Sequence, residues 1–545
     1  MKHAPKYPTW QGMSEVRSTV AFTHEVPVWI TLQELQGFGD WREFCSGGRH
    51  VRGVMGRRNS TPPNLFSRSE VCMRSVFFLC VSLACLSLAR TAEGAPSDDM
   101  RHAVSRAAAL QGVALAEGAP VSAALLGSSN LGGSERVALF GDVAHYRYRL
   151  QVGPSQQDVV TLHRVVREDW AWRPARATRA VFMVHGDGWG FEAAFLSSIG
   201  SAFVPPEQSI AAYLAKEGVD VWGIDLRWAG VPQNTQDFRF MKSWTLETHA
   251  ADVGVALGVA KLLRLAGGNF MGTMHLLGWS RGAVVGYAYL NREARLPRAL
   301  RQVDGFIPMD MAVRFSPQDA QQQAWACERY EALSNARQEG QLEGGLLGPA
   351  PGIMLQAIGQ LAAVQPAAPS PLVQDDIFGP GTGRPSNRKL ALVAAGATSV
   401  LFAPLQPVVP AYHLMGSTPD TMGLPERLSF THEGYLFEFG QRAAPYQSIN
   451  EVVETEAWAC GKHVPYGDRL RDVKVPVLYV GAAGGVGRYG EHSVTLLGSR
   501  DVTLLNVSTL PEAARALDYG HADLFLADDA RMRVWKPMLQ WIRAH

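Results

Sequence analysis

A short apolar stretch of the chain ends in a serine that has glycines on both sides. Residues 274–279 have the composition of a buried strand, and the stretch ends in the pattern Gly278-Trp-Ser280-Arg-Gly282. Such a turn between a strand and a helix leaves the serine hydroxyl exposed, because the glycines let the chain reverse tightly. The pattern alone is not specific, since about 0.3 copies are expected by chance in such a chain. Ser280 is therefore a nucleophile candidate that needs support from other residues.

A serine nucleophile needs a general base, and a histidine late in the chain suits this role. His521 lies in the segment Asp518-Tyr-Gly-His-Ala-Asp523, on a glycine-containing loop just before the expected final helix. We interpret Asp523 as structural rather than catalytic. The sequence thus predicts His521 as the general base.

Apolar segments predict the strands that must position these residues. Residues 180–184 form one such segment, and it runs into the glycine-rich loop His185-Gly-Asp187-Gly-Trp-Gly190. Backbone amides in such a loop can stabilise a negative charge that develops on an oxygen. The other expected elements are a hairpin of 146–150 and 159–165, a strand within 219–230, a helix over about 245–265, and strands over 303–309 and 475–481.

In this order along the chain, the motifs resemble those of the α/β-hydrolase family, over roughly residues 140–545. The resemblance implies an α/β fold with a mostly parallel, doubly wound sheet and a helical cap insertion. It also implies that Ser280 attacks an acyl carbon while His521 accepts and then returns the proton. By motif position, the backbone N–H groups of Asp187 and Arg281 would hold the oxyanion. Alternatively, the Asp187 carboxylate caps the next helix.

The acid of the triad is the point at which the sequence departs from the family. Many members carry it just after the penultimate strand, but here residues 475–481 run into Ala-Ala-Gly-Gly-Val-Gly at 482–487. Asp310, directly after the strand at 303–309, is our first choice, because some members use this position instead. Glu491, further along the glycine-rich loop, is the alternative. A Ser-His dyad without an acid would still be an enzyme.

The segment 312–470 lies between the strands expected at 303–309 and 475–481, where the family carries a cap over the active site. We expect residues of this cap to determine which substrate binds. Its residues 352–361 and 390–395 are apolar, and one face of the cap is expected to line a hydrophobic cleft. We expect its aromatic residues to form cap core rather than a binding surface: Trp325, Tyr412, Tyr435, Phe437 and Trp458.

The amino-terminal part has the features of an export signal. Met73-Arg-Ser precedes the apolar run 76–89, and small residues follow around Gly94. The run is shorter than the ~20 residues that a membrane span needs. We therefore predict a signal peptide over 73–94, no stable membrane span after its removal, and a secreted or periplasmic protein. An uncleaved anchor is the alternative.

Composition and cysteine spacing fit an exported globular enzyme. Hydrophobic residues make up 47% of the 545 residues and charged residues 19%, so the chain can bury a large core. A formal net charge of +1 gives no indication of a nucleic-acid partner. Cys327 and Cys460 each end an Ala-Trp-Ala-Cys sequence, and we predict a disulfide between them, with two buried free thiols as the alternative. The histidines are scattered, and neither a metal site nor a cofactor is predicted.

These observations define the expected organisation and function. The protein is expected to be a serine hydrolase that cleaves a carboxylic ester, or a related acyl bond, of a small-molecule or lipid-like substrate with an apolar portion. A cofactor-free acyltransferase or haloperoxidase-like enzyme, and a catalytically silent binding protein on the same scaffold, are the alternatives. The expected segments are a leader (1–72), a signal peptide (73–94), an extension (95–140), a first core part (141–311), a cap (312–470) and a second core part (471–545).

Overall fold

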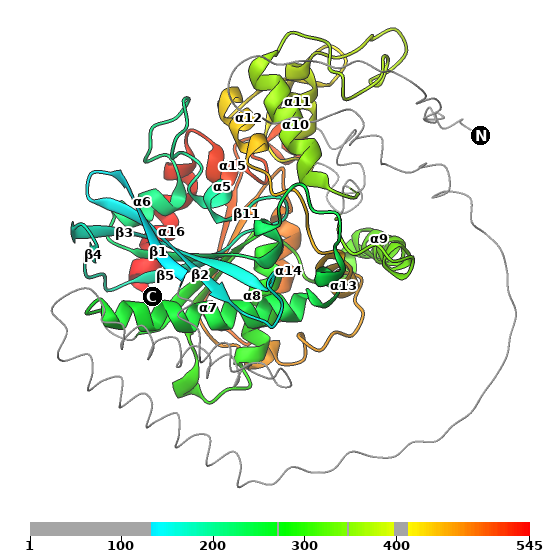
Figure 1. The fold of residues 1–545 in the computed structure, drawn as a ribbon. Helices are drawn as coiled ribbons and strands as arrows, with labels where there is room; N and C mark the ends of the chain where they lie inside the picture. The colour runs from blue at the N-terminus through cyan, green and yellow to red at the C-terminus, as the bar shows by residue number, and fades with distance from the viewer. Residues whose placement is uncertain (1–131, 270–271, 346–347, 397–411) are drawn as a thin grey trace, which may run out of the picture. The chain divides into compact units, whose positions relative to one another are not determined.

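The computed structural model describes residues 132–269, 272–345, 348–396 and 412–545. The predicted leader and signal peptide, and the predicted extension up to residue 131, lie outside these residues. The described part forms a mixed β-sheet with helices packed on both faces (Figure 1). None of its helices has the length and apolar character that crossing a membrane requires.

The main sheet has ten strands, in the order β1-β2-β3-β6-β5-β7-β8-β11-β12, with β4 paired to β3. From β6 to β12 in this order, adjacent strands are parallel to each other. The pairs β1–β2, β2–β3 and β3–β6 are antiparallel. The carboxyl ends of the parallel strands therefore meet at one edge of the sheet, where α/β folds place their sites. The strands are β1 (Gly132–Phe140), β2 (Val143–Gln151), β3 (Val159–Trp170), β4 (Arg173–Pro174), β5 (Ala180–Val184), β6 (Asp220–Asp225), β7 (Met274–Trp279), β8 (Val303–Met309), β11 (Val477–Ala482) and β12 (Val502–Val507).

The first strand corrects the expected start of the core at residue 141. The predicted hairpin is present as β2 and β3, but β1 precedes it and pairs antiparallel with β2. Arg136 on β1 donates a hydrogen bond from Nε to Glu168 Oε1 at 2.8 Å, which ties the edge strand to β3. The strand was missed because its sequence begins Gly-Gly-Ser and carries two charges, so its apolar alternation is weak.

Side chains of the central strands alternate between two hydrophobic cores, one on each face of the sheet. In β5, Val181 and Met183 belong to one core, while Phe182 and Val184 belong to the other. Because helices cover both faces, these strands are apolar along their whole length. Helices α6 and α16 contribute to the first core, and α7 and α8 contribute to the second.

The long helix expected over about 245–265 is α7, which spans Leu246–Ala266. The Thr245 hydroxyl caps it by accepting a hydrogen bond from the Thr248 N–H at 3.2 Å. The other helices of the two core parts are α5 (Phe191–Phe195), α6 (Ile210–Lys216), α8 (Arg281–Glu293), α14 (Glu491–Val494), α15 (Asp523–Leu526) and α16 (Lys536–Ala544).

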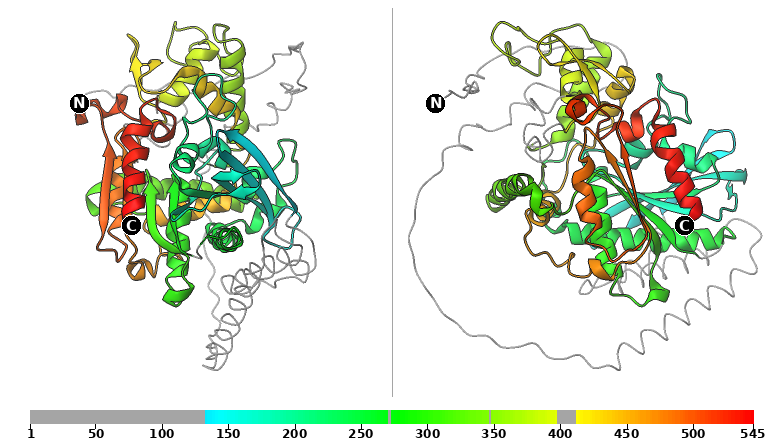
Figure 2. Two further views of the ribbon diagram at one scale, coloured as in Figure 1. Left: turned by 90° about the vertical axis from the view of Figure 1, so that its left-hand side faces the viewer. Right: turned by 180° about the vertical axis from the view of Figure 1, so that it is seen from behind.

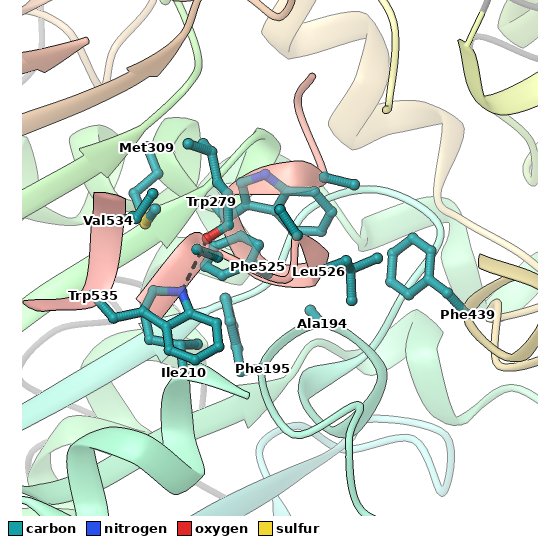
Figure 3. Close-up of a cluster of buried hydrophobic side chains, with 14 of the residues drawn as sticks. Ala194, Phe195, Ile210, Trp279, Met309, Phe439, Phe525, Leu526, Val534 and Trp535 are labelled. Atoms are coloured by element: carbon teal, nitrogen blue, oxygen red, sulfur yellow. Dashed lines mark hydrogen bonds between the residues drawn. The ribbon is translucent and has the colours of Figure 1, made fainter. Parts of the chain in front are cut away.

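A cluster of aromatic and aliphatic side chains contains Trp279, the last residue of β7 (Figure 3). Phe525 packs edge-on against Trp279, with ring centroids 5.2 Å apart, and against Phe195 at 5.3 Å. Trp279 precedes Ser280 directly, and Phe525 lies shortly after His521. The cluster therefore holds together the two chain segments that carry Ser280 and His521.

The segment between β8 and β11 holds most of the remaining helices, and α10, α11 and α12 lie together beyond one end of the sheet (Figures 1 and 2). Its elements are α9 (Ala320–Gln338), α10 (Pro351–Val364), α11 (Asn387–Gly396), β9 (Ser417–Pro419), β10 (Pro425–Leu428), α12 (Glu433–Gln441) and α13 (Ile449–Ala459). Trp325, Tyr435, Phe437 and Trp458 are buried, whereas Tyr412 is partly exposed. Both hydrophobic cores contain side chains from this segment as well as from the sheet, so the segment packs directly against the rest of the fold.

Candidate active site

Ser280 occupies the sharp turn between β7 and α8. Its backbone has a φ of 55° and a ψ of −129°, a conformation that residues other than glycine rarely adopt. The Ser280 N–H donates a hydrogen bond to the Met309 carbonyl at 2.9 Å, which ties the turn to the end of β8. The serine is partly exposed. This is the geometry that a nucleophile elbow requires.

Three glycines make this turn possible. A Cβ on Gly278 would lie 2.3 Å from the Gly282 carbonyl oxygen, and one on Gly282 would lie 2.1 Å from the Val184 carbonyl oxygen. A Cβ on Gly186 would lie 2.6 Å from the Cβ of Ser280. Gly278 therefore lets the turn close on the start of α8, and Gly282 lets it approach the end of β5. Gly186 brings the loop after β5 against the serine.

His521 is fixed by its ring and by its backbone. Its Nδ1 lies 2.7 Å from Oδ2 of Asp310, and both side chains are buried. Its backbone N–H donates to the His413 carbonyl at 3.0 Å. The imidazole stacks on Trp279, with ring centroids 5.0 Å apart and planes inclined by 28°. With Nδ1 donating to the carboxylate, Nε2 is the nitrogen left to accept a proton.

Asp310 is surrounded by the glycine-rich loop after β11. Its Oδ1 accepts hydrogen bonds from the N–H groups of Ala482 at 2.9 Å and Gly487 at 2.7 Å, and its Oδ2 accepts one from Val486 at 3.1 Å. A Cβ on Gly485 would lie 2.0 Å from Oδ2. The loop thus carries no acid at the usual position, but it makes room for an acid from β8 and binds it with backbone amides.

The two other carboxylates discussed in the sequence analysis, Glu491 and Asp523, do not bond to the His521 ring. Glu491 begins α14 and accepts a hydrogen bond from the Asn506 side chain, so it is Asp310 that meets His521. Asp523 is buried and accepts hydrogen bonds from the Gly520 N–H at 2.8 Å and from two groups of the insertion. Asp523 therefore braces the histidine loop and does not bond to the imidazole.

Ser280 and His521 line one cavity with a volume of about 140 Å³. No hydrogen bond joins the serine hydroxyl to His521 within the described residues, and in unliganded sites this bond is often too long to count. Most of the wall is apolar. Its apolar residues include Trp189, Met311, Phe315, Leu355, Leu414 and Val486.

The two residues whose amides were assigned to the oxyanion also line this cavity, and their side chains form an ion pair. Arg281 donates to Asp187 from Nε at 2.5 Å and from Nη2 at 2.7 Å, and the Gln447 side chain donates to the same carboxylate. Burial acts to lower the pKa of Arg281, but the Asp187 carboxylate more than offsets this effect and raises it. Arg281 is also the first residue of α8, so the helix supplies no partner for its N–H.

The helix-capping alternative for Asp187 is wrong. Its carboxylate bonds to Arg281 and Gln447, whereas the Phe191 N–H at the start of α5 donates to Asp225 Oδ1 at 2.7 Å. Gly190 occupies the cap position itself.

A second ion pair in the cavity wall was not found from the sequence. Arg329 on α9 donates from Nη2 to Glu456 on α13 at 2.6 Å, and both residues line the cavity. The predicted disulfide between Cys327 and Cys460 is present and joins the same two segments. The doubled Ala-Trp-Ala-Cys sequence indicated that the two segments meet, but residues of both charges lie near each cysteine, so it did not single out this ion pair.

Two histidines that seem scattered in the sequence meet on neighbouring strands. His145 Nε2 lies 3.0 Å from His163 Nδ1, and His163 Nε2 lies 3.0 Å from Asp225 Oδ2. With Glu192, the two rings form a group of the kind that could hold a metal ion. Burial lowers the pKa of His145 to about 2. The two rings and Asp225 lie in one row of short contacts, although His163 Nε2 has no hydrogen-bond partner of acceptable geometry within the described residues.

The strand order and the position of Ser280 after β7 define an α/β-hydrolase fold. No family model and no curated protein matches this chain. The solved structures similar to it include a candidate lipase from Sulfolobus solfataricus (18% identity, 76% of this chain and 99% of that chain, TM-score 0.48). Also similar is an esterase from Exiguobacterium antarcticum (12% identity, 71% of this chain and 96% of that chain, TM-score 0.35). A thermophilic esterase from Thermogutta terrifontis is similar too (14% identity, 73% of this chain and 98% of that chain, TM-score 0.33). Likenesses of this size transfer no substrate to this chain.

Proposed function

We propose that the protein is a serine hydrolase that cleaves the carboxylic ester of a small acid with an apolar portion. The observation that carries the proposal is the cavity shared by Ser280, on its strained turn, and His521, whose Nδ1 is bonded to Asp310. A partly exposed hydroxyl, a base whose Nε2 can accept a proton and a buried acid are the parts that covalent acyl transfer needs.

The reaction would proceed through an acyl-enzyme. His521 Nε2 accepts the hydroxyl proton while Ser280 Oγ attacks the acyl carbon, and Asp310 stabilises the imidazolium that forms. The N–H groups of Asp187 and Arg281 are proposed to bind the oxyanion. The alcohol then leaves with the proton from His521. Water attacks the acyl-enzyme by the same route, releasing the carboxylic acid and the free serine.

The cavity favours a short acyl group. Its volume of about 140 Å³ is close to that of an apolar cavity that holds a benzene-sized molecule, on the order of 150 Å³. An acyl chain of about four to six carbons has this bulk. Long lipid chains would have to extend out of the cavity, so they are expected to be poorer substrates.

A panel of p-nitrophenyl esters tests the proposal. We expect the full chain to hydrolyse these esters, with kcat/KM highest for acyl chains of about four to six carbons. Absence of hydrolysis across the panel, with a folded protein, would favour a silent binding protein. Transfer of the acyl group to an added alcohol in preference to water would favour an acyltransferase.

We further propose that the protein is exported with a signal peptide over residues 73–94. The support is the disulfide Cys327–Cys460, because structural disulfides persist mainly in oxidising compartments. Expression in a bacterial host should give a mature amino terminus near Ala95, which amino-terminal sequencing would detect. A protein that keeps the run 76–89 would instead be anchored by it.

A further inference from the structure

Asp187 is held by hydrogen bonds of its side chain and not of its backbone. Among the described residues, neither its N–H nor its carbonyl oxygen makes a hydrogen bond. Its carboxylate accepts three: from Arg281 Nε at 2.5 Å, from Arg281 Nη2 at 2.7 Å and from the Gln447 side chain. The carboxylate therefore fixes the position of this residue in the loop after β5.

The peptide that carries the Asp187 N–H lies close to the nucleophile. A Cβ on Gly186, the residue on the other side of this peptide, would lie 3.3 Å from Ser280 Oγ. The second N–H assigned to the oxyanion belongs to Arg281, and it also makes no hydrogen bond within the described part of the chain. Both residues line the cavity with Ser280. The ion pair thus joins the side chains of the two residues whose unbonded amides lie next to the nucleophile.

The ion pair also compensates a charge that would oppose the reaction. A lone carboxylate beside the oxyanion would repel the negative charge that develops there. The buried Arg281 guanidinium binds both carboxylate oxygens of Asp187, so the pair carries no net charge. Two parallel hydrogen bonds fix the orientation of the carboxylate as well as its distance.

We propose that the ion pair between Asp187 and Arg281 positions the two N–H groups that bind the oxyanion. The two side chains act as positioning groups, because they work through the backbone amides of their own residues. This inference rests on the proposed function and deepens it: stabilisation of the oxyanion depends on a side-chain link between the loop after β5 and the first turn of α8.

Two esters that differ in one atom provide the test: p-nitrophenyl pentanoate and its thiono analogue, in which sulfur replaces the carbonyl oxygen. Sulfur is a weak hydrogen-bond acceptor, so well-placed N–H groups stabilise a negative oxygen more than a negative sulfur. Each kcat/KM is divided by the rate of hydroxide-catalysed hydrolysis of the same ester, which removes the difference in intrinsic reactivity. We expect the natural protein to favour the oxygen ester by about tenfold or more in this normalised ratio.

The double variant Asp187→Leu/Arg281→Met removes both charges together, so no buried charge is left alone. We expect kcat for the pentanoate to fall by about 10–100-fold with KM little changed, since a displaced donor costs less than the about 10²–10³-fold of a donor removed outright. The normalised ratio should fall by about threefold or more. Asp310→Asn, which acts through His521, should instead slow both esters alike and keep the ratio.

Two further variants complete the set. The matched control is Arg388→Met/Glu433→Leu, which removes a bidentate pair between α11 and α12 that does not line the cavity. It should keep both kcat and the ratio of the natural protein. Arg281→Lys keeps the charge beside Asp187 but cannot form two parallel hydrogen bonds, so we expect it to fold and to lower the ratio by about twofold.

The possible outcomes separate this inference from the proposed function. If the natural protein hydrolyses neither ester, the proposed function fails, and the inference fails with it. If it hydrolyses the pentanoate with a ratio near one, or if the folded double variant keeps the natural ratio, only the positioning role is wrong. If the double variant does not fold, Arg281→Lys decides, and an unchanged ratio in that variant overturns the inference.

Discussion

Two walls of the same cavity are built in different ways. On the sheet side, Ser280 and His521 line the cavity, and the buried Asp310 bonds to His521. All three lie at turns held by backbone hydrogen bonds and by glycines that leave no room for a side chain. On the helical side, Arg329 and Glu456 come from two helices whose segments a disulfide joins. The sheet side sets atomic positions through the main chain, whereas the helical side sets them through paired side chains.

This difference suggests that the sheet side positions the reacting groups and that the helical side determines which substrate binds. Positions fixed by close backbone contacts cannot adjust without displacing a strand, which suits groups that must meet a reacting atom. Side chains on helices can be exchanged with little change to the sheet, which suits substrate choice. We therefore expect substitutions on the sheet side to reduce turnover with every ester, and substitutions on the helical side to alter selectivity or stability.

The largest effect is expected at the nucleophile. Ser280→Ala should reduce turnover of every ester by about 10⁴-fold or more, and His521→Ala should be nearly as severe. Because the two residues form one proton-transfer unit, the double variant should be little worse than either single variant. Steady-state kinetics with p-nitrophenyl pentanoate measures this, with Ser499→Ala as a control outside the cavity. Turnover within tenfold of the natural protein in Ser280→Ala would contradict the assignment.

The next largest effect is expected at the acid. Asp310→Asn should reduce kcat by about 10²–10⁴-fold with KM little changed, because the imidazole would then favour the wrong tautomer. Glu491→Gln should change kcat by less than about threefold, since its carboxylate bonds to Asn506. The two variants are compared under identical conditions. The opposite ranking would assign the role to Glu491, and two mild results would indicate a dyad.

A smaller effect on turnover is expected in the loop that holds the acid. In Gly485→Ala the added Cβ would lie 2.0 Å from Asp310 Oδ2, so the carboxylate or the loop must move. A displacement of about 1 Å at a catalytic group can cost on the order of 10²-fold in rate. Gly230→Ala is the control, since nothing lies within 4 Å of its Cβ position. Equal kcat values for the two variants would show that the loop does not hold the acid in place.

The smallest effect on turnover is expected on the helical side. Cys327→Ala/Cys460→Ala opens a link between residues 133 positions apart, and loss of its constraint on the unfolded chain predicts destabilisation of roughly 4–5 kcal/mol before strain is subtracted. Urea unfolding measures this loss. In the folded variant, kcat for the pentanoate should change by no more than a few-fold. A drop as large as that of Asp310→Asn would mean that the helical wall also holds the chemistry.

The sheet side could be predicted from the sequence because its information is local. The elbow around Ser280 and the loop around His521 are short motifs with fixed spacing, and their order along the chain added specificity. Asp310 could be named as a candidate acid, but the sequence alone could not decide between Asp310 and Glu491. The deciding fact is tertiary: Gly485 and the amides at 482, 486 and 487 surround the Asp310 side chain, which comes from the end of another strand.

The helical side could not be predicted in the same way, because its contacts join residues far apart in the chain. The pairing of Arg329 with Glu456 depends on how α9 and α13 pack, and the repeated Ala-Trp-Ala-Cys indicated only that their segments meet. The His145–His163 contact likewise depends on the strand register, which the sequence alone did not give. In the β2–β3 register His145 faces Val165 and Arg147 faces His163, so the two histidines are diagonal neighbours on one face.

Covalent labelling of Ser280 tests the central claim most directly. A fluorophosphonate reacts only with a serine that a neighbouring base activates, so its reaction reports the whole site and needs no knowledge of the substrate. After labelling and proteolysis, mass spectrometry should find the adduct on the peptide that contains Ser280, and labelling should be absent in Ser280→Ala and slowed in Asp310→Asn. A folded protein that remains unlabelled, or an adduct on another serine, would contradict the account.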